Sequence, residues 1–183
     1  RGKVYLYCVE VTCPSSGWKV PVLPTFVVST SKSVVVKLVP DSQNKRYAIE
    51  LVTNATAAQM KAAEKGTYLK GNVSHRVNGK WHINSMSSIR GDYSEVVDGK
   101  RVNKNKLRFW EKSDIVFRDT DIYNERLYAV QWIKDDESTR PETEFRSVTK
   151  ADLIREAKVT KYVQENLSDW QEQGWVPDTR IES

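Results

Sequence analysis

Cysteine is scarce in this chain, which holds only Cys8 and Cys13 among its 183 residues. Two cysteines are too few for the disulfide framework of a small secreted domain. Long hydrophobic runs are missing as well: there is neither the stretch of about 18 apolar residues that a membrane span needs nor the apolar block of a signal peptide. We therefore expect a reduced, intracellular and cytoplasmic protein that does not enter a membrane. The missing initiator methionine leads us to expect a piece of a longer protein.

Recognisable catalytic motifs are also absent. The sequence contains no G-x-S-x-G elbow, no P-loop, no G-x-G-x-x-G turn and no H-E-x-x-H pair. Its two histidines, His75 and His82, lie without an obvious nucleophile to activate, and we predict that both are exposed to solvent. The consecutive acids Asp135, Asp136 and Glu137 are typical of a solvated loop rather than a metal site. We expect no catalytic residue, no metal and no cofactor in this chain.

What remains is the composition of an ordinary globular protein, with 39% hydrophobic and 29% charged residues. Most of the chain has the pattern of antiparallel β-strands, because runs of β-branched and aromatic residues alternate with turn-forming residues. Such runs lie at 4–11, 26–28, 33–39 and 46–52. Residues 126–133 alternate between apolar and polar side chains, and with 143–148 they predict a long hairpin across a polar loop.

The middle of the chain is harder to interpret. Residues 55–65 predict a short Ala-rich helix, with Thr53 or Asn54 as N-cap and Gly66 as C-cap. Residues 67–112 predict an irregular, basic and partly mobile region. Within it, short strands are expected at 68–69 and 80–83, with turns at Asn78-Gly79 and Asp98-Gly99.

The clearest element is a long C-terminal helix over residues 150–173. Thr149 and Asp152 form a capping box at its start, apolar residues recur at near-helical spacing, and Gly174 ends it. The sequence therefore predicts an α+β fold: one antiparallel β-rich domain over residues 1–183, with a short Ala-rich helix and a long C-terminal helix.

Charge is distributed unevenly along the chain. Residues 1–112 carry 19 basic and 8 acidic side chains, whereas residues 113–183 carry 10 basic and 16 acidic ones. The net charge of +5 therefore hides a portion of +11 and a portion of −6. This asymmetry indicates that the first portion faces a polyanion, while the acidic portion faces solvent or another part of the protein.

The densest basic stretch is residues 100–110, KRVNKNKLRFW. Lys and Arg neutralise phosphates, Asn contacts phosphates or base edges, and aromatic side chains stack on unpaired bases. An alternative is a solvated loop that keeps a neighbouring strand from aggregating. The candidate DNA-binding residues are Lys100, Arg101, Asn103, Lys104, Lys106 and Arg108.

Residues 11–18, VTCPSSGW, have the outline of a zinc-ribbon knuckle. Such a knuckle reads C-P-x-C-G, because two thiolates bind one tetrahedral ion while Pro and Gly build the turn between them. Cys13, Pro14 and Gly17 are retained, but Ser16 stands where the second thiolate belongs. Serine does not normally ligate structural zinc, so the sequence predicts the shape of the knuckle without its metal.

Several fragments together resemble the large adenine-specific DNA methylases that contain a zinc ribbon. They occur in the same order along nearly the whole chain, at residues 7–21, 89–92, 107–112, 125–130 and 151–182. The resemblance implies that the chain is an internal, non-catalytic accessory (insertion) domain of an enzyme that methylates the exocyclic amine of adenine in DNA. S-adenosylmethionine is expected for that parent enzyme, and its catalytic domain is an expected partner.

The sequence departs from this family in two respects. The catalytic D/N/S-P-P-Y/F tetrapeptide and the glycine-rich cofactor turn have no match, so no catalytic or cofactor-binding residue is carried over. The second cysteine pair would fall at 73–78, which contains Ser74 and His75 but no cysteine. We expect a degenerate zinc ribbon without zinc. The alternative is an unorthodox metal site that draws on Cys8, Cys13, His75 or His82.

Two functions are consistent with these observations. The leading hypothesis is a DNA-binding or target-recognition domain whose basic portion contacts phosphates, because extrusion of a base requires protein contacts on the surrounding strand. The alternative is a structural docking or assembly domain, whose basic face lies on the acidic face of the catalytic domain or of a second subunit. An independent hydrolase or nuclease lacks a credible set of catalytic residues.

Overall fold

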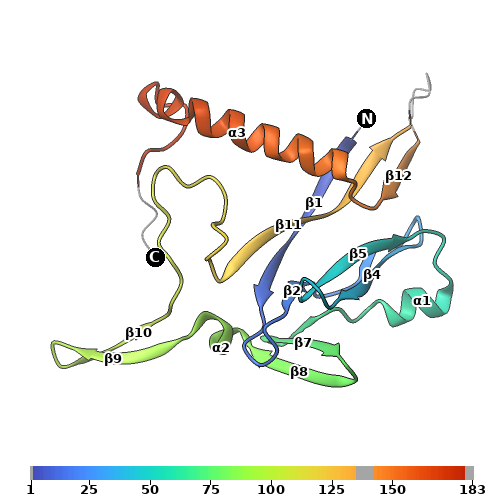
Figure 1. The fold of residues 1–183 in the computed structure, drawn as a ribbon, viewed down its shortest axis with the longest axis horizontal. Helices are drawn as coiled ribbons and strands as arrows, with labels where there is room; N and C mark the ends of the chain where they lie inside the picture. Colours follow the sequence, from blue (N-terminus) through green and yellow to red (C-terminus); the bar gives the residue numbers. More distant parts are fainter. Residues whose placement is uncertain (1, 135–141, 180–183) are drawn as a thin grey trace.

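The structure is a computed structural model that describes residues 2–134 and 142–179. The protein is α+β, with most strands in antiparallel sheets, short helices and one long C-terminal helix (Figure 1). The strands are β1 (Gly2–Thr12), β2 (Lys19–Val22), β3 (Val27–Ser29), β4 (Val34–Asp41), β5 (Arg46–Val52), β6 (Tyr68–Leu69), β7 (Asn72–Val77), β8 (Lys80–Ser85), β9 (Tyr93–Val97), β10 (Lys100–Lys104), β11 (Tyr123–Ile133) and β12 (Thr143–Arg146). The helices are α1 (Ala57–Ala62), α2 (Met86–Arg90) and α3 (Lys150–Glu172). The predicted fold class is confirmed.

The largest sheet has seven strands in the order β12-β11-β1-β2-β5-β4-β3. Its two longest strands, β1 and β11, pair in antiparallel fashion along nearly their whole length. The neighbours β2 and β5 pair in parallel at Lys19 and Arg46. The predicted hairpin between 126–133 and 143–148 is confirmed by the pairing of β11 with β12, and the acids predicted in its loop, 135–137, lie outside the described residues.

Residues 67–112 are more regular than the sequence predicts. A three-stranded sheet in the order β6-β7-β8 is followed by α2 and then by a second, separate hairpin of β9 and β10. The predicted turn at Asn78-Gly79 joins β7 to β8, and both residues have positive φ, 50° and 77°. A two-residue hairpin turn requires this backbone conformation, which Asn and Gly adopt at little cost.

The main core lies where the end of β1 meets the sheet of β6, β7 and β8. Branched and aromatic side chains from both sheets and from α2 fill it, and the buried members are Val11, Cys13, Trp18, Val20, Tyr47, Val73, Val77 and Ile89. These strands pack together because their apolar residues alternate with exposed ones, so one face of each strand is buried. The core thereby fixes the position of α2 and of the hairpin that follows it.

The short helix α1 is shifted relative to its prediction. It begins after Thr56, which forms a capping box with Gln59, and its C-cap is Ala63. The caps predicted at 53–54 and at Gly66 are therefore wrong. Gly66 lies instead where the chain passes close to Leu23, since a Cβ at this position would clash with the Leu23 carbonyl oxygen.

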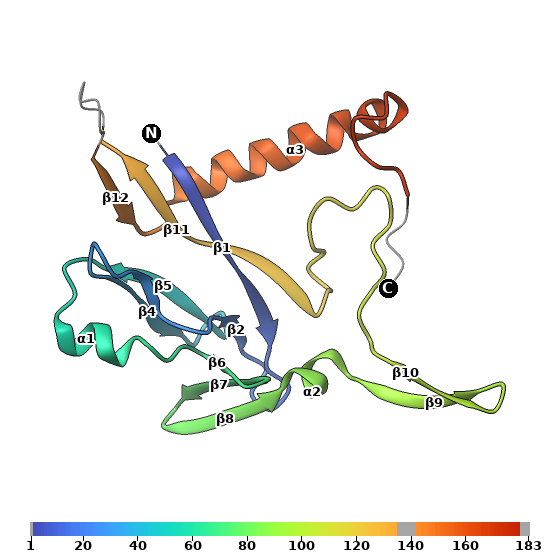
Figure 2. The ribbon, with the colours of Figure 1, turned by 180° about the vertical axis from the view of Figure 1, so that it is seen from behind.

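The long helix α3 agrees closely with its prediction. The hydroxyl of Thr149 accepts a hydrogen bond from the Asp152 N–H, and the Asp152 carboxylate accepts one from the Thr149 N–H at 2.9 Å, as in a capping box. Past the C-cap Gln173, Gly174 takes a left-handed φ of 72°. The helix lies beside β1 and β11 in both views (Figures 1 and 2). No helix among the described residues is long and apolar enough to cross a membrane.

A buried ion pair ties three strands of the main sheet together. Glu10 of β1 is only 3% exposed. It accepts a hydrogen bond from Arg46 of β5 at 2.9 Å and a second from Arg126 of β11. Because both carboxylate oxygens of Glu10 are used, this charged group is satisfied inside the sheet.

Candidate nucleic-acid interface

The hairpin of β9 and β10 projects from the rest of the protein as a two-stranded ribbon (Figures 1 and 2). The strands join at the predicted turn, where Asp98 and Gly99 have φ values of 51° and 75°. All five residues of β10 are exposed, as are four of the five in β9. A loop, the alternative considered for residues 100–110, is therefore wrong for the first half, which is a strand with both faces open to solvent.

Cross-strand pairing sorts the basic side chains of this ribbon onto two faces. Lys100 and Lys104 share one face, while Arg101 and Asn103 share the other. Lys104 forms an ion pair with Glu95, and Asn103 accepts a hydrogen bond from Ser94 at 2.7 Å. Beside the tip, Lys100 and Arg101 have no acidic partner among the residues that the structure describes. Because Asp98 lies in the turn itself, it offsets one of these two charges, and one net positive charge remains near the end of the ribbon.

Lys106 lies where the ribbon joins the body. Its N–H donates a hydrogen bond to the carbonyl of Arg90 at 2.9 Å, and its aliphatic stem passes over Gly91. A Cβ at Gly91 would stand 2.8 Å from the Lys106 Cδ, and Gly91 also has a left-handed φ of 65°. The Lys106 side chain is exposed, so its ammonium group faces solvent beside the ribbon.

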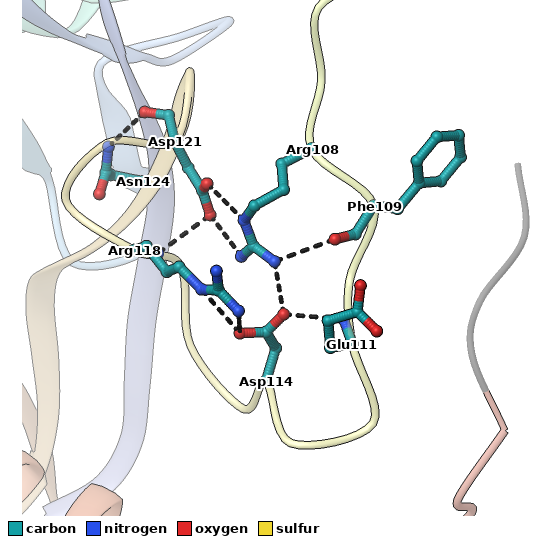
Figure 3. A network of polar contacts seen from close by, with 7 residues as sticks. All are labelled: Arg108, Phe109, Glu111, Asp114, Arg118, Asp121 and Asn124. Carbon is teal, nitrogen blue, oxygen red and sulfur yellow. Dashed lines mark hydrogen bonds and ion pairs between the residues drawn. The ribbon is translucent and has the colours of Figure 1, made fainter.

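Arg108 differs from the other predicted DNA-binding residues because carboxylates already surround it (Figure 3). Its Nε donates to Asp121 at 2.8 Å, and its Nη1 pairs with Asp114. Arg118 also pairs with Asp114, at 2.9 Å. A hydrogen bond from the Glu111 N–H and the two guanidinium groups lower the pKa of Asp114 to about 2. Arg108 thus holds the segment 108–121 together, and a phosphate would have to displace two carboxylates to reach it.

An open cleft of about 880 Å³ lies between the base of the ribbon and this ion-pair network. Its lining is mostly aromatic and apolar, with Tyr93, Val102, Leu107, Phe109, Trp110, Phe117, Ile122 and Tyr123. Trp110 packs edge-to-face on Phe117 with ring centroids 5.0 Å apart. Its polar lining residues are Asn103, Lys104, Asn105, Arg108 and Asp121. Five of the six predicted DNA-binding residues therefore lie in the ribbon or line this cleft, and Lys106 is next to both.

The knuckle predicted at residues 13–17 is a tight turn. The N–H of Gly17 donates to the carbonyl of Cys13 at 2.8 Å. Ser16, which stands for the second thiolate, lies with its Oγ 3.1 Å from the Nε2 of His75. Ser15 and His82 are also within hydrogen-bond distance, with 3.1 Å between the Ser15 Oγ and the His82 Nδ1. No group of three or more His, Cys, Asp or Glu side chains suited to a metal ion occurs in residues 2–134 and 142–179.

The prediction that His75 is exposed is wrong, since only 4% of its surface is accessible. Its Nδ1 lies 2.9 Å from the Tyr47 hydroxyl, and its ring stacks on that of His82 at 5.3 Å. Burial, and to a smaller extent the nearby His82, lowers the pKa of His75 to about 4. The imidazole is therefore neutral at pH 7. From β7 it contacts Ser16 of the turn at residues 13–17 and Tyr47 of β5 through uncharged hydrogen bonds.

No family model, curated protein or solved structure matches this chain.

The sequence predicted the turn at Asp98-Gly99 but not the two strands that it joins, although a signal for them was available. An Asp-Gly pair flanked by β-branched residues is a strong hairpin signal, and Val96 and Val97 precede Asp98 while Val102 follows Gly99. The cleft had no such signal. Its lining combines segments far apart in the chain, such as Tyr93 of β9 and Phe117.

Proposed function

We propose that this chain is a non-catalytic DNA-binding domain of an S-adenosylmethionine-dependent adenine-specific DNA methyltransferase, and that the ribbon of β9 and β10 contacts the DNA. The observation that carries the proposal is a projecting two-stranded ribbon with Lys100 and Arg101 exposed beside its tip. The methyltransferase assignment rests on the ordered sequence fragments that resemble that family. The DNA-binding assignment rests on the ribbon and on the charge of residues 1–112.

The shape and chemistry of the ribbon suit duplex DNA. The major groove of B-DNA is about 12 Å wide and admits a two-stranded β-ribbon. Lysine and arginine on such a ribbon neutralise phosphates, and the release of counterions gives binding without sequence preference. Asn103 shares a face with Arg101, so this face offers both a cation for phosphate and an amide for base edges.

A second candidate function is docking on another protein surface. It is favoured by an exposed apolar row on β1, where Tyr5, Tyr7 and Val9 project from the same face of the strand. A domain whose main role is to dock through this row would bind DNA weakly or not at all. This row lies on a different strand from the ribbon, so separate variants test the two functions.

The proposal is tested by the salt dependence of DNA binding. Titration of a fluorescent duplex is expected to give a Kd of roughly 10⁻⁴–10⁻⁶ M near physiological salt, because the contacts are electrostatic. The double variant Lys100→Gln/Arg101→Gln should bind more weakly. The slope of its plot of log Kd against log salt concentration should be smaller by about two, since each lost phosphate contact removes about 0.9 from that slope.

The matched control is Lys61→Gln/Lys65→Gln, which removes the same charge beside α1, at the far end of the molecule from the ribbon (Figure 1). This control should leave the salt slope unchanged. The proposal fails if the unmodified chain does not bind the duplex, or if the two double variants lose the same affinity. Absence of binding would make docking through β1 the better account, whereas equal losses would show that DNA binds away from the ribbon.

A further inference from the structure

The outer strand of the three-stranded sheet has a free hydrogen-bonding edge. The strand order is β6-β7-β8, so among the described residues β8 pairs with β7 and with no second strand. In both views β8 lies along the lower boundary of the molecule (Figures 1 and 2). An edge strand carries a row of unpaired N–H and C=O groups, and this row is a template for pairing with a further strand.

The backbone groups at this edge belong to Trp81 and Ile83. Ser74 of β7 lies opposite Ile83, and its N–H donates to the carbonyl of Thr67 at 2.7 Å, on the side of β7 away from β8. Two opposite residues in an antiparallel pair direct their N–H and C=O groups either towards each other or both away. Ile83 therefore directs these groups away from β7, and Trp81, two residues earlier, does the same.

The side chains of the same two residues are exposed on the outer face of the sheet. Trp81 is 61% and Ile83 66% accessible to solvent. Their neighbours His82 and Asn84 point to the other face, where both lie within hydrogen-bond distance of Ser15. Soluble proteins usually cover a free edge with large apolar side chains or interrupt it with charge, so this edge has the character of an interface.

The sequence of β8 is complementary to itself when two copies run antiparallel about His82. Trp81 of each copy then lies opposite Ile83 of the other, which gives two aromatic–β-branched pairs of the kind that stabilises sheets. Both residues direct their backbone groups outward, so each pair also exchanges hydrogen bonds. Pairing centred on Trp81 or on Ile83 would instead place one of the two opposite Gly79 or Ser85.

The charge of β8 permits this pairing. Lys80 is the one Lys, Arg, Asp or Glu residue in the strand, and in the pairing about His82 it lies opposite Asn84 of the second copy. The two lysines are then separated by four residues along the seam, roughly 14 Å, which exceeds the screening length of about 8 Å at physiological ionic strength. The centre of the edge is apolar and uncharged, so its best complement is a strand of the same kind rather than a charged peptide.

We propose that two copies of this chain pair along β8, antiparallel and about a twofold axis at His82. The three-stranded sheets of the two copies then join into one sheet of six strands. Because the seam spans only Lys80–Asn84 of each copy, the interface is small, and the dimer forms reversibly with a Kd of roughly 10⁻⁶–10⁻³ M. The ribbon of β9 and β10 is not part of this surface, so the proposal does not depend on the DNA-binding function.

Sedimentation equilibrium over this concentration range tests the proposal. The average mass should rise from that of one chain towards that of two. Ile83→Lys should weaken association at least about tenfold, because it removes both apolar pairs and adds two cations to the seam. Leu69→Lys is the matched control, since Leu69 is 59% exposed on the same outer face but lies on β6, at the opposite edge of the sheet. This control should leave association unchanged, and circular dichroism checks that both variants fold.

Hydrogen exchange of individual amides, followed by NMR, identifies the edge that pairs. The amides of Trp81 and Ile83 should exchange more slowly at high protein concentration, whereas those of β4, inside the main sheet, should not change. A chain that stays monomeric up to about 1 mM overturns the proposal. A dimer that forms without slower exchange at these two amides, or that both lysine variants weaken equally or not at all, also overturns it, because the copies then associate through another surface.

Discussion

Replacing Glu10 with glutamine is expected to lower the free energy of unfolding by about 3 kcal/mol, which is at the lower end of the range for breaking a buried ion pair. The substitution preserves the size of the side chain but leaves Arg46 and Arg126 without their counter-charge between three strands. Arg46 keeps partial contact with water, at 40% side-chain exposure, and this reduces the cost. Urea denaturation followed by circular dichroism measures the change.

Glu50→Gln is the matched control for this prediction. Glu50 lies on β5 and pairs with Lys37 at 3.4 Å, but both side chains are more than half exposed. Exposed pairs of this kind contribute about 0–1 kcal/mol because water screens them. A loss at Glu10 no larger than the loss at Glu50 would show that the buried pair does not hold the strands together.

Lowering the pH from 6.5 to 4 is expected to destabilise the protein by about 2 kcal/mol through His75 alone. The folded-state pKa of about 4 is below the ordinary value of 6.5, so between these values the unfolded chain binds a proton that the folded protein does not. The contribution of His75 is therefore fully present above pH 6.5 and is lost as the pH falls towards 4. Each unit of pKa difference corresponds to about 1.4 kcal/mol, and the partial access of solvent to the neighbouring Ser15 and His82 reduces the total.

Carboxylates also titrate between pH 6.5 and 4, so the test compares the loss of stability over this range in the unmodified protein with the loss in two variants. His75→Gln keeps a hydrogen-bonding side chain, and its stability should fall less steeply from pH 6.5 to 4 than that of the unmodified protein. His82→Gln removes the smaller of the two causes that lower the pKa of His75, so this variant should keep most of the pH dependence of stability. Equal slopes in the unmodified protein and in His75→Gln would contradict a buried, neutral His75.

Local sequence signals predicted the elements that local chemistry determines. The capping box of Thr149 and Asp152 and the period of the apolar residues located α3 within one residue of its observed bounds. β5 was located residue for residue, since turn-forming residues flank it. The caps of α1 were wrong because Thr53, Asn54 and Thr56 all have cap chemistry, and only the packing of the chain selects among them.

The candidate site was predictable in composition but not in arrangement. Cations, asparagines and aromatic residues at 100–110 are visible in the sequence, yet their division into a ribbon and a cleft depends on distant residues. Asp114 and Asp121 form ion pairs with Arg108, which the sequence analysis grouped with the exposed cations. His75 is buried by Tyr47 and Ser16, 28 and 59 residues away, and no nearby residue indicates this.

Amide hydrogen exchange with and without duplex DNA tests the central claim most directly. A two-stranded ribbon on its own is marginally stable, so the amides of Tyr93–Val97 and Lys100–Lys104 should exchange quickly in the free protein. DNA should slow their exchange and leave that of Ala57–Ala62 in α1 unchanged. Slowed exchange in β1 or α1 with none in the ribbon would contradict the claim that the ribbon of β9 and β10 is the DNA-binding element.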